Sequence, residues 1–450
     1  MSFTRTLRAV GGAVVAGALL FGAAPVALAD QIRNDQWALK AFGTEDIWKL
    51  STGKGVTVAV IDGPVNGSHP DLKGTVLAGK SFVTGGRADQ GSGAEGDHGT
   101  SMAALIAAHG HGPGGEDGVK GLAPDAKILP VAINLSTDAV PKLGAETKYA
   151  EALRYAVDHG ASVINMSFVS SRGDLSPDER EAIAYARKHD VLLVAGTGND
   201  GVETPRYPGS APGVLAVGAV DKHLNVWKYS NYGDQVKLTA PGAYIRSAGT
   251  ETPYHLANGT SDATAYVSAA AALLRSKFPN LTAGQIANRL VKTAGLPEDK
   301  SSIKLPDAHY GYGFIKPYSA LTKDVPAGSK NGPLPALDGD SSPNSSKAPG
   351  SNDDSAKINS DKGMSTGAII GIAAGVVVVL VIILVVVLVA KKKRRNGPPP
   401  GGPGGFGGPG GPGGPGGFVP HPPNPNNSYQ QQPGGPGAYP PAPPTQPPGR

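Results

Sequence analysis

Cysteine is absent from the 450 residues of the chain. A folded segment without disulfides must be stabilised by its own hydrophobic core, and about 290 residues can bury enough surface to form one. The absence also removes a common class of zinc ligand, and the ten histidines show no spacing typical of a metal site. No clustered carboxylate loop indicates calcium, and no cofactor motif is present. The sequence therefore predicts neither a bound metal nor a cofactor.

Acidic side chains are missing from both ends of the chain. Residues 1–29 and 391–450 contain eight lysines and arginines but no aspartate or glutamate, whereas the whole chain has a net charge of +5. Subtracting those eight charges leaves −3 for the residues between them. A weakly acidic segment offers no electrostatic attraction to a phosphate backbone. We therefore expect no nucleic-acid partner.

Charged and polar side chains are also absent from residues 367–390, a run long enough to cross a hydrocarbon core of roughly 30 Å as a helix. The basic residues 391–395 follow at once, and basic residues beside a membrane helix stay in the cytoplasm. Residues 1–29 combine a positive start, a short apolar stretch and an Ala-x-Ala site, as a secretory signal does. We therefore expect a single-pass protein of the cell membrane, with residues 30–366 outside the cytoplasm and the tail inside.

The chain divides further by composition. Residues 327–366 are rich in Ser, Asn, Asp, Pro and Gly, which is typical of a flexible stalk. Residues 391–450 are a basic cluster followed by a Gly/Pro-rich tail that cannot form a core, and we expect this tail to be disordered. Docking to a cytoplasmic partner through polyproline segments and a purely solubilising role are equally good interpretations of the tail. Residues 30–326 are left as the folded domain, which begins with an apolar arm.

This domain alternates apolar, β-branched runs with helical patterns. An uninterrupted apolar run is typical of a strand buried in a parallel sheet. The predicted strands cover residues 55–61, 127–133, 161–168, 191–195, 213–220 and 236–240. The predicted helices cover residues 97–108, 145–159, 177–189 and 282–293, and another begins near residue 261. This order predicts an α/β fold of three layers with a mostly parallel sheet.

Four polar residues stand at the ends of these elements. Asp62 and Asn199 each follow a buried strand, at the sheet edge where α/β proteins bind ligands. His98 stands near the start of a helix, and Ser261 follows Gly259 at the start of another. The positive end of a helix favours an oxyanion. Taken singly, each residue also has a plain structural interpretation as a turn residue, a surface polar group or a helix N-cap.

Together, Asp62, His98 and Ser261 are the three side chains that a serine protease requires. The serine attacks a carbonyl, the histidine takes its proton, and the aspartate orients the histidine. The side-chain amide of Asn199 would donate to the oxyanion, a contact worth about 2.7–4 kcal/mol. The order Asp, His, Ser is that of subtilisin. An α/β-hydrolase would instead need a G-x-S-x-G motif and the order Ser, Asp, His, and neither is present.

At these residues the sequence resembles the subtilisin-like (S8) serine peptidases. Within this family it looks like the mycosins, membrane-anchored proteases that accompany type VII secretion systems of actinobacteria. The matching motifs lie at residues 58–62, 69–72, 98–100, 198–199 and 259–261, within a resemblance that covers about residues 35–320. The resemblance implies a seven-stranded parallel sheet, hydrolysis of protein or peptide substrates in the cell envelope, and partners among type VII secretion components. It also assigns Ser167, Phe168 and Val169 to the substrate-binding groove.

Two departures from the family pattern bear on activity. Val169 and Ser170 stand where the family typically has two glycines, so their side chains would alter the groove. Asp262 follows the serine directly, where the family mostly has an apolar residue. A carboxylate at this position would raise the pKa of the nearby histidine and disfavour an oxyanion. We therefore expect a membrane-anchored serine endopeptidase, with a catalytically weak or inactive scaffold of a secretion complex as the alternative.

Overall fold

A computed structural model describes residues 31–83, 85–135, 148–170 and 173–335 of the chain. Its centre is a seven-stranded sheet with the strand order β2-β5-β1-β6-β7-β8-β9, and all six neighbouring pairs are parallel. The strands are β1 (Thr57–Asp62), β2 (Lys80–Ser81), β5 (Lys127–Ala132), β6 (Val163–Met166), β7 (Leu192–Gly196), β8 (Val214–Val220) and β9 (Leu238–Pro241). The predicted α/β fold with a mostly parallel sheet is confirmed.

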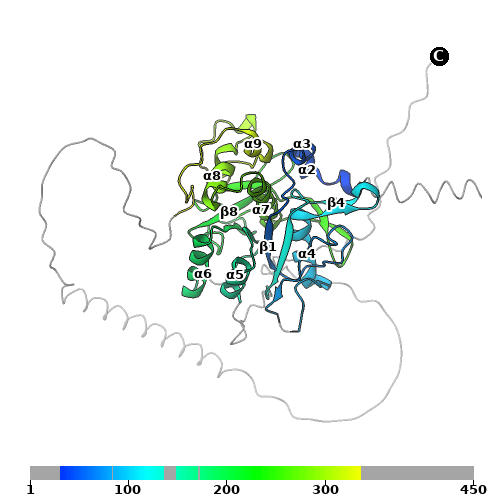
Figure 1. The fold of residues 1–450 in the computed structure, drawn as a ribbon. Helices are drawn as coiled ribbons and strands as arrows, with labels where there is room; N and C mark the ends of the chain where they lie inside the picture. The colour runs from blue at the N-terminus through cyan, green and yellow to red at the C-terminus, as the bar shows by residue number, and fades with distance from the viewer. Residues whose placement is uncertain (1–30, 84, 136–147, 171–172, 336–450) are drawn as a thin grey trace, which may run out of the picture. The chain divides into compact units, whose positions relative to one another are not determined.

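Helices cover both faces of this sheet (Figure 1). One face packs against α4 (Gly93–Ala107), α7 (Thr260–Lys277) and α8 (Ala283–Thr293), and the other against α5 (Tyr149–Asp158) and α6 (Pro177–Lys188). The smaller elements are α2 (Trp37–Phe42), α3 (Thr44–Trp48), α9 (Pro317–Thr322), the 3₁₀ turns η1 (Pro113–Gly115) and η2 (Glu298–Lys300), and the paired strands β3 (His109–His111) with β4 (Asp117–Lys120) and β10 (Ile245–Ala248) with β11 (Tyr254–Ala257).

The alternation of side chains along β1 decides which face receives Asp62. Val58 and Val60 belong to the core beneath α4 and α7, whereas Ala59 and Ile61 belong to the core beneath α5 and α6. Successive side chains of a strand point to opposite faces. Asp62 therefore faces α4 and α7, the two helices that carry His98 and Ser261.

The helix that carries His98 begins earlier than we predicted from the sequence. We expected it to start at residue 97, but α4 begins at Gly93, so His98 lies in its second turn. The additional first turn of α4 packs closely on the loop after β1, because a Cβ on Gly63 would lie 2.1 Å from the carbonyl oxygen of Glu95. The expected start of α5 near residue 145 lies outside the described residues, and its described part begins at Tyr149.

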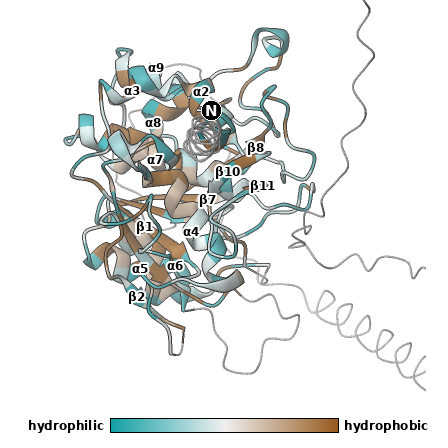
Figure 2. Cartoon of the chain, turned by 90° about the vertical axis from the view of Figure 1, so that its right-hand side faces the viewer, coloured by the Kyte–Doolittle hydropathy of each residue, from teal (hydrophilic) through white to brown (hydrophobic). Residues whose placement is uncertain are grey.

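The apolar arm predicted at the start of the domain packs against α7. Figure 2 shows hydrophobic residues, in brown, along the central strands and α7. The arm adds Leu39, Phe42 and Ile47 to the hydrophobic core between these elements. The ring of Phe42 lies 5.6 Å from that of Tyr266 and 5.7 Å from that of Phe314. Because Tyr266 is on the helix that begins beside Ser261, the arm supports the element that positions this serine.

The described part of the chain contains no helix that is both long and apolar enough to cross a membrane. The signal predicted at residues 1–29, the membrane segment predicted at 367–390 and the tail predicted at 391–450 lie outside the described residues.

We expect Phe42→Ala to lower the free energy of unfolding by about 3–5 kcal/mol, because it removes a buried aromatic ring and leaves a cavity beside α7. Leu50→Ala is the control. Leu50 is exposed, so its truncation should change stability by no more than about 0.5 kcal/mol. Urea unfolding followed by tryptophan fluorescence measures both variants. Equal effects would contradict the packing of the arm on the core.

Candidate active site

Asp62, which is fully buried, and His98, which is partly exposed, form a hydrogen-bonded pair at the carboxyl edge of the sheet. The His98 Nδ1 lies 2.8 Å from Asp62 Oδ1 and 3.0 Å from Oδ2. The backbone N–H of Gly63 also donates to Asp62 Oδ1, at 2.7 Å. An ionised carboxylate only accepts, so His98 carries a proton on Nδ1 and, when the ring is neutral, has its lone pair on Nε2. The His98 side chain is 32% exposed, which leaves it accessible to a bound molecule.

Three carboxylates act on the pKa of His98. Burial alone would lower it, but the negative charge and hydrogen bond of Asp62, together with the charges of Asp262 and Asp97, outweigh burial and raise the pKa to about 9. A raised pKa means that a larger fraction of the imidazole is protonated at neutral pH than in an isolated histidine, so less of it is available as a base.

Ser261 is inside the helix rather than at its cap. Gly259 is the N-cap of α7, so Ser261 is the second helical residue and the interpretation of it as a mere N-cap is wrong. Its Oγ donates to the backbone oxygen of Ser167 at 3.1 Å, and the Ser167 Oγ donates to the backbone oxygen of Ser261 at 3.0 Å. Between these described residues, no hydrogen bond joins Ser261 Oγ to His98. The serine and the imidazole are on neighbouring helices, but the hydroxyl is turned towards Ser167.

Asn199 is held with its amide nitrogen free to donate. Its Oδ1 accepts from both the backbone N–H and the Oγ1 of Thr260, each at 2.9 Å. This fixes the side chain, because the oxygen is occupied and Nδ2 must lie on the other side. Nδ2 is 3.6 Å from the position that a Cβ on Gly259 would take, so it lies beside the first turn of α7. An oxyanion hole requires such a side-chain donor, and the role of Asn199 as that donor stays a prediction.

A narrow pocket adjoins Ser261. It is lined by Ser167, Phe168, Val169, Gly196, Gly198, Asn199, Thr260 and Ser261. Its accessible volume is about 10 Å³, close to what one water molecule needs. The structure thus brings the three predicted groove residues together with the serine around a narrow space. A role for these three residues in binding substrate stays a prediction.

Asp262 lies beside the serine and is also buried, with 2% of its surface exposed. Burial raises the pKa of its carboxyl to about 7, against the opposing effects of the His98 charge and of a backbone hydrogen bond. Among the described residues, Oδ1 of this carboxyl has no hydrogen-bond partner. The carboxylate expected from the sequence to act on the histidine is therefore close enough to do so, and it contributes to the raised pKa of His98.

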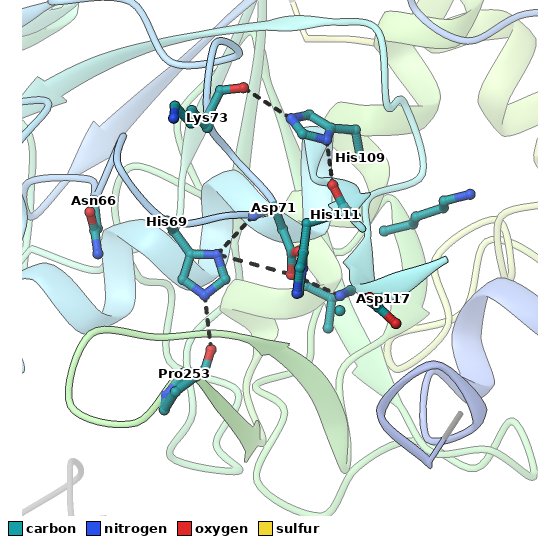
Figure 3. Close-up of polar contacts among 12 residues, drawn as sticks. Asn66, His69, Asp71, Lys73, His109, His111, Asp117 and Pro253 are labelled. Carbon is teal, nitrogen blue, oxygen red and sulfur yellow. Dashed lines mark hydrogen bonds and ion pairs between the residues drawn. The ribbon is translucent and has the colours of Figure 1, made fainter. Parts of the chain in front are cut away.

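A second cluster of histidines and aspartates, which sequence analysis missed, lies outside this pocket (Figure 3). His111 lies in a glycine-rich stretch, which predicts a solvated side chain. In the structure, however, its Nδ1 lies 2.5 Å from Asp71 Oδ1. Asp71 is fully buried and also accepts from the N–H of Val119, at 2.8 Å. The ring of His69 lies between the N–H of Asp71, at 3.2 Å, and the carbonyl of Pro253, at 3.1 Å.

These bonds join the loop after β1 to the two small hairpins, and a cavity of about 600 Å³ lies beside them. Within the described ranges, no three His, Asp or Glu side chains are arranged to hold a metal ion. In the sequence, only the family motif at residues 69–72 marked any part of this cluster.

An aspartate–histidine pair facing a serine-bearing helix, at the carboxyl edge of a parallel sheet, is an arrangement typical of α/β serine hydrolases. Residues 53–313 match the subtilase (peptidase S8) family, and the chain belongs to that family. It is therefore a subtilisin-like serine endopeptidase.

Two curated relatives illustrate the match. Thermitase of Thermoactinomyces vulgaris is 30% identical over 286 residues, which are 64% of this chain and 95% of thermitase. Fervidolysin of Fervidobacterium pennivorans is 33% identical over 324 residues, 66% of this chain, but the match spans only 45% of fervidolysin.

Among solved structures, the chain is similar to MycP1 from Mycobacterium smegmatis, with a TM-score of 0.55 and 28% identity. The match covers 67% of this chain and 88% of that one. MycP1 with its N-terminal propeptide removed gives a TM-score of 0.54 and 30% identity, with coverage of 65% and 99%. The described domain and MycP1 therefore share the subtilisin-like fold.

We expect Gly196→Ala to destabilise the site, because the new Cβ would lie 2.8 Å from Thr260 Oγ1, the atom that also bonds Asn199. Overpacking of this kind costs about 1–3 kcal/mol in free energy of unfolding. Gly173→Ala is the control, since nothing lies within 4 Å of its Cβ position. Chemical denaturation measures both. A neutral effect at Gly196 would show that the start of α7 can move away from β7.

Proposed function

We propose that this peptidase hydrolyses peptide bonds through Asp62, His98 and Ser261, with Asn199 as an oxyanion donor. The observation that carries the proposal is the 2.8 Å contact between His98 Nδ1 and Asp62 Oδ1. It orients the ring and places the basic lone pair on Nε2, as a general base for a serine requires.

The first step requires a turn of the serine side chain. Ser261 Oγ leaves the Ser167 carbonyl and hydrogen-bonds to His98 Nε2, which takes its proton as Oγ attacks the substrate carbonyl. The negative charge that develops on the carbonyl oxygen is stabilised by Asn199 Nδ2 and by the positive end of α7. The His98 imidazolium, stabilised by Asp62, then gives its proton to the leaving amine. A water molecule, activated by the same histidine, releases the acyl group from Ser261.

The alternative function is a scaffold with little turnover. Two observations favour it: the Ser261 hydroxyl is bonded to Ser167 rather than to His98, and the adjoining pocket has room for about one water molecule. The scaffold would keep the fold of a peptidase without presenting an activated serine.

A fluorophosphonate probe distinguishes the two functions, because it reacts with an activated serine and does not depend on knowing the substrate. We expect the full chain in detergent to be labelled, and Ser261→Ala and His98→Ala to reduce the labelling rate by more than about 10³-fold. Ser276→Ala, a change on the same helix α7, should keep the wild-type rate. A folded wild-type chain without labelling would favour the scaffold.

We further propose that residues 367–390 anchor the peptidase in the cell membrane with its catalytic domain outside, and that it acts with a type VII secretion system. The apolar run and the basic residues 391–395 support the anchor. The similarity to MycP1 supports the secretion link, because one solved structure of that protein is described as a serine protease that is an essential component of the type VII (ESX-1) secretion system. Its substrates would then be proteins or peptides in the cell envelope.

Truncation tests the anchor. A chain that ends at residue 366 should appear in the culture medium, because it lacks the apolar run, whereas a chain that ends at residue 395 should remain in the membrane fraction. Immunoblots of the two fractions measure the distribution. Membrane retention of the shorter chain would contradict the proposed anchor, and release of both would place the anchoring determinant in the tail.

A further inference from the structure

Asn231 is a buried asparagine that the proposed mechanism does not use. It lies on the connection between β8 and β9 and is 1% exposed. Among the described residues, its Nδ2 has no hydrogen-bond partner. Burying an unpaired amide costs free energy, so the other contacts of this residue must offset that cost. Its three remaining polar atoms all contact one loop, residues 197–202, which follows β7.

This loop carries Asn199, the proposed oxyanion donor, and Asn231 is bonded to the loop on both sides of that residue. The backbone N–H of Asn231 donates to the carbonyl of Gly198, at 3.0 Å. Asn231 Oδ1 accepts from the N–H of Asp200 at 2.9 Å and from that of Val202 at 3.2 Å. The orientation of the side-chain amide is therefore fixed, because only its oxygen can accept from two N–H groups.

The backbone oxygen of Asn231 adds a contact at the beginning of the same loop. It accepts from Thr197 Oγ1 at 3.0 Å, and Thr197 is itself buried. Gly198, the next residue, has a φ of 107°, which side chains rarely adopt. A Cβ on Gly198 would also lie 2.5 Å from Asn231 Nδ2. The turn that leads to the oxyanion donor is thus packed directly against Asn231.

Resting on the oxyanion role proposed above for Asn199, we propose that Asn231 is a positioning residue of the active site, which holds the loop after β7 so that the Asn199 amide stays aimed at the oxyanion. Asn231 does not touch the reacting atoms in this role. Thr260 of α7 bonds the side chain of Asn199. Asn231 fixes the backbone from which that side chain extends.

The loop needs such support because it lies beyond the sheet. β7 ends at Gly196, so residues 198–202 are outside the ladder of hydrogen bonds that holds the strand. Two backbone hydrogen bonds, between residues 201 and 229 and between residues 202 and 232, join the loop to the segment that contains Asn231. The bonds to the Asn231 side chain are the part of this contact that a substitution can remove.

Positioning matters here because an oxyanion donor acts only if it is held in place before the charge develops. A hydrogen bond weakens steeply when its length or angle departs from the optimum. A loop that moves by a fraction of an ångström would keep the Asn199 amide but lose much of its effect on the transition state. The contribution of Asn231 should therefore be visible only while Asn199 is present.

The test is a double-mutant cycle on the full-length chain in detergent, measured as the rate of fluorophosphonate labelling. The phosphonyl oxygen gains negative charge during labelling and needs the same donor. Asn199→Ala should slow labelling by about 10²–10³-fold. Asn231→Ala should slow it by at least about tenfold, because the donor remains but is no longer held in place. In a chain that already carries Asn199→Ala, adding Asn231→Ala should change the rate by less than about twofold.

A merely structural role would give the same fold-loss in both backgrounds, because the effects of independent changes multiply. That result overturns the inference and leaves the oxyanion role of Asn199 standing. If Asn199→Ala is labelled as fast as the wild type, the proposed oxyanion donor is wrong, and the inference fails with it. A folded wild-type chain without labelling removes both as well.

Asn225→Ala is the matched control, because Asn225 is an exposed asparagine on the same connection and, within the described residues, has no hydrogen bond to the loop. Its labelling rate should equal that of the wild type.

Thr197→Val provides a second variant, which replaces Asn231→Ala in the cycle if that chain does not fold. It keeps the shape of the side chain and removes only the hydroxyl that donates to Asn231. We expect about threefold slower labelling, again only when Asn199 is present. An equal loss in both backgrounds overturns the inference. Failure of both variants to fold overturns it too, since these bonds would then serve the fold.

Discussion

The close contact between the start of α7 and the ends of β6 and β7 is the constraint on which the site depends. Thr260 is the centre of this contact: its Oγ1 accepts from the N–H of Gly198 at 3.2 Å and donates to Asn199. Position 196 has no room for a side chain, because a Cβ on Gly196 would lie 2.8 Å from Thr260 Oγ1. The helix is therefore held against the sheet at the residue before Ser261, so the serine and the amide of Asn199 are positioned by the same hydrogen bonds.

This constraint explains why the fold was more predictable than the state of the site. The sheet follows from apolar runs such as residues 55–61, because such runs have few alternatives to a buried parallel strand. The position of Asp62 follows from the strand that precedes it, and the alternation of its neighbours determines its face. These are local patterns that a sequence displays directly.

Other features could not be predicted because they depend on contacts between distant residues. The early first turn of α4 packs on Gly63 of the loop after β1, at Glu95, whereas the glycines at residues 91, 93 and 96 by themselves favour a loop. The bond between Ser261 Oγ and the Ser167 carbonyl joins residues 94 positions apart, and so does its reciprocal bond. The Asp71 cluster likewise assembles from three separate segments, and only its short motif was visible beforehand.

The two buried carboxylates of the site, Asp62 and Asp262, differ in what they do to His98. The Asp62 carboxylate alone is enough to orient His98. The backbone N–H of Gly63 donates a hydrogen bond to this carboxylate. The hydrogen bonds to the ring come from Asp62, so the second buried carboxylate, Asp262, is not what orients it. What it adds is negative charge in a place of low dielectric, where charge acts strongly on its neighbours. The charge favours the imidazolium over the neutral base, and it opposes an oxyanion at the start of α7. A subtilisin-like site with an apolar residue at this position would avoid both effects, so Asp262 distinguishes the electrostatics of this site from the family pattern.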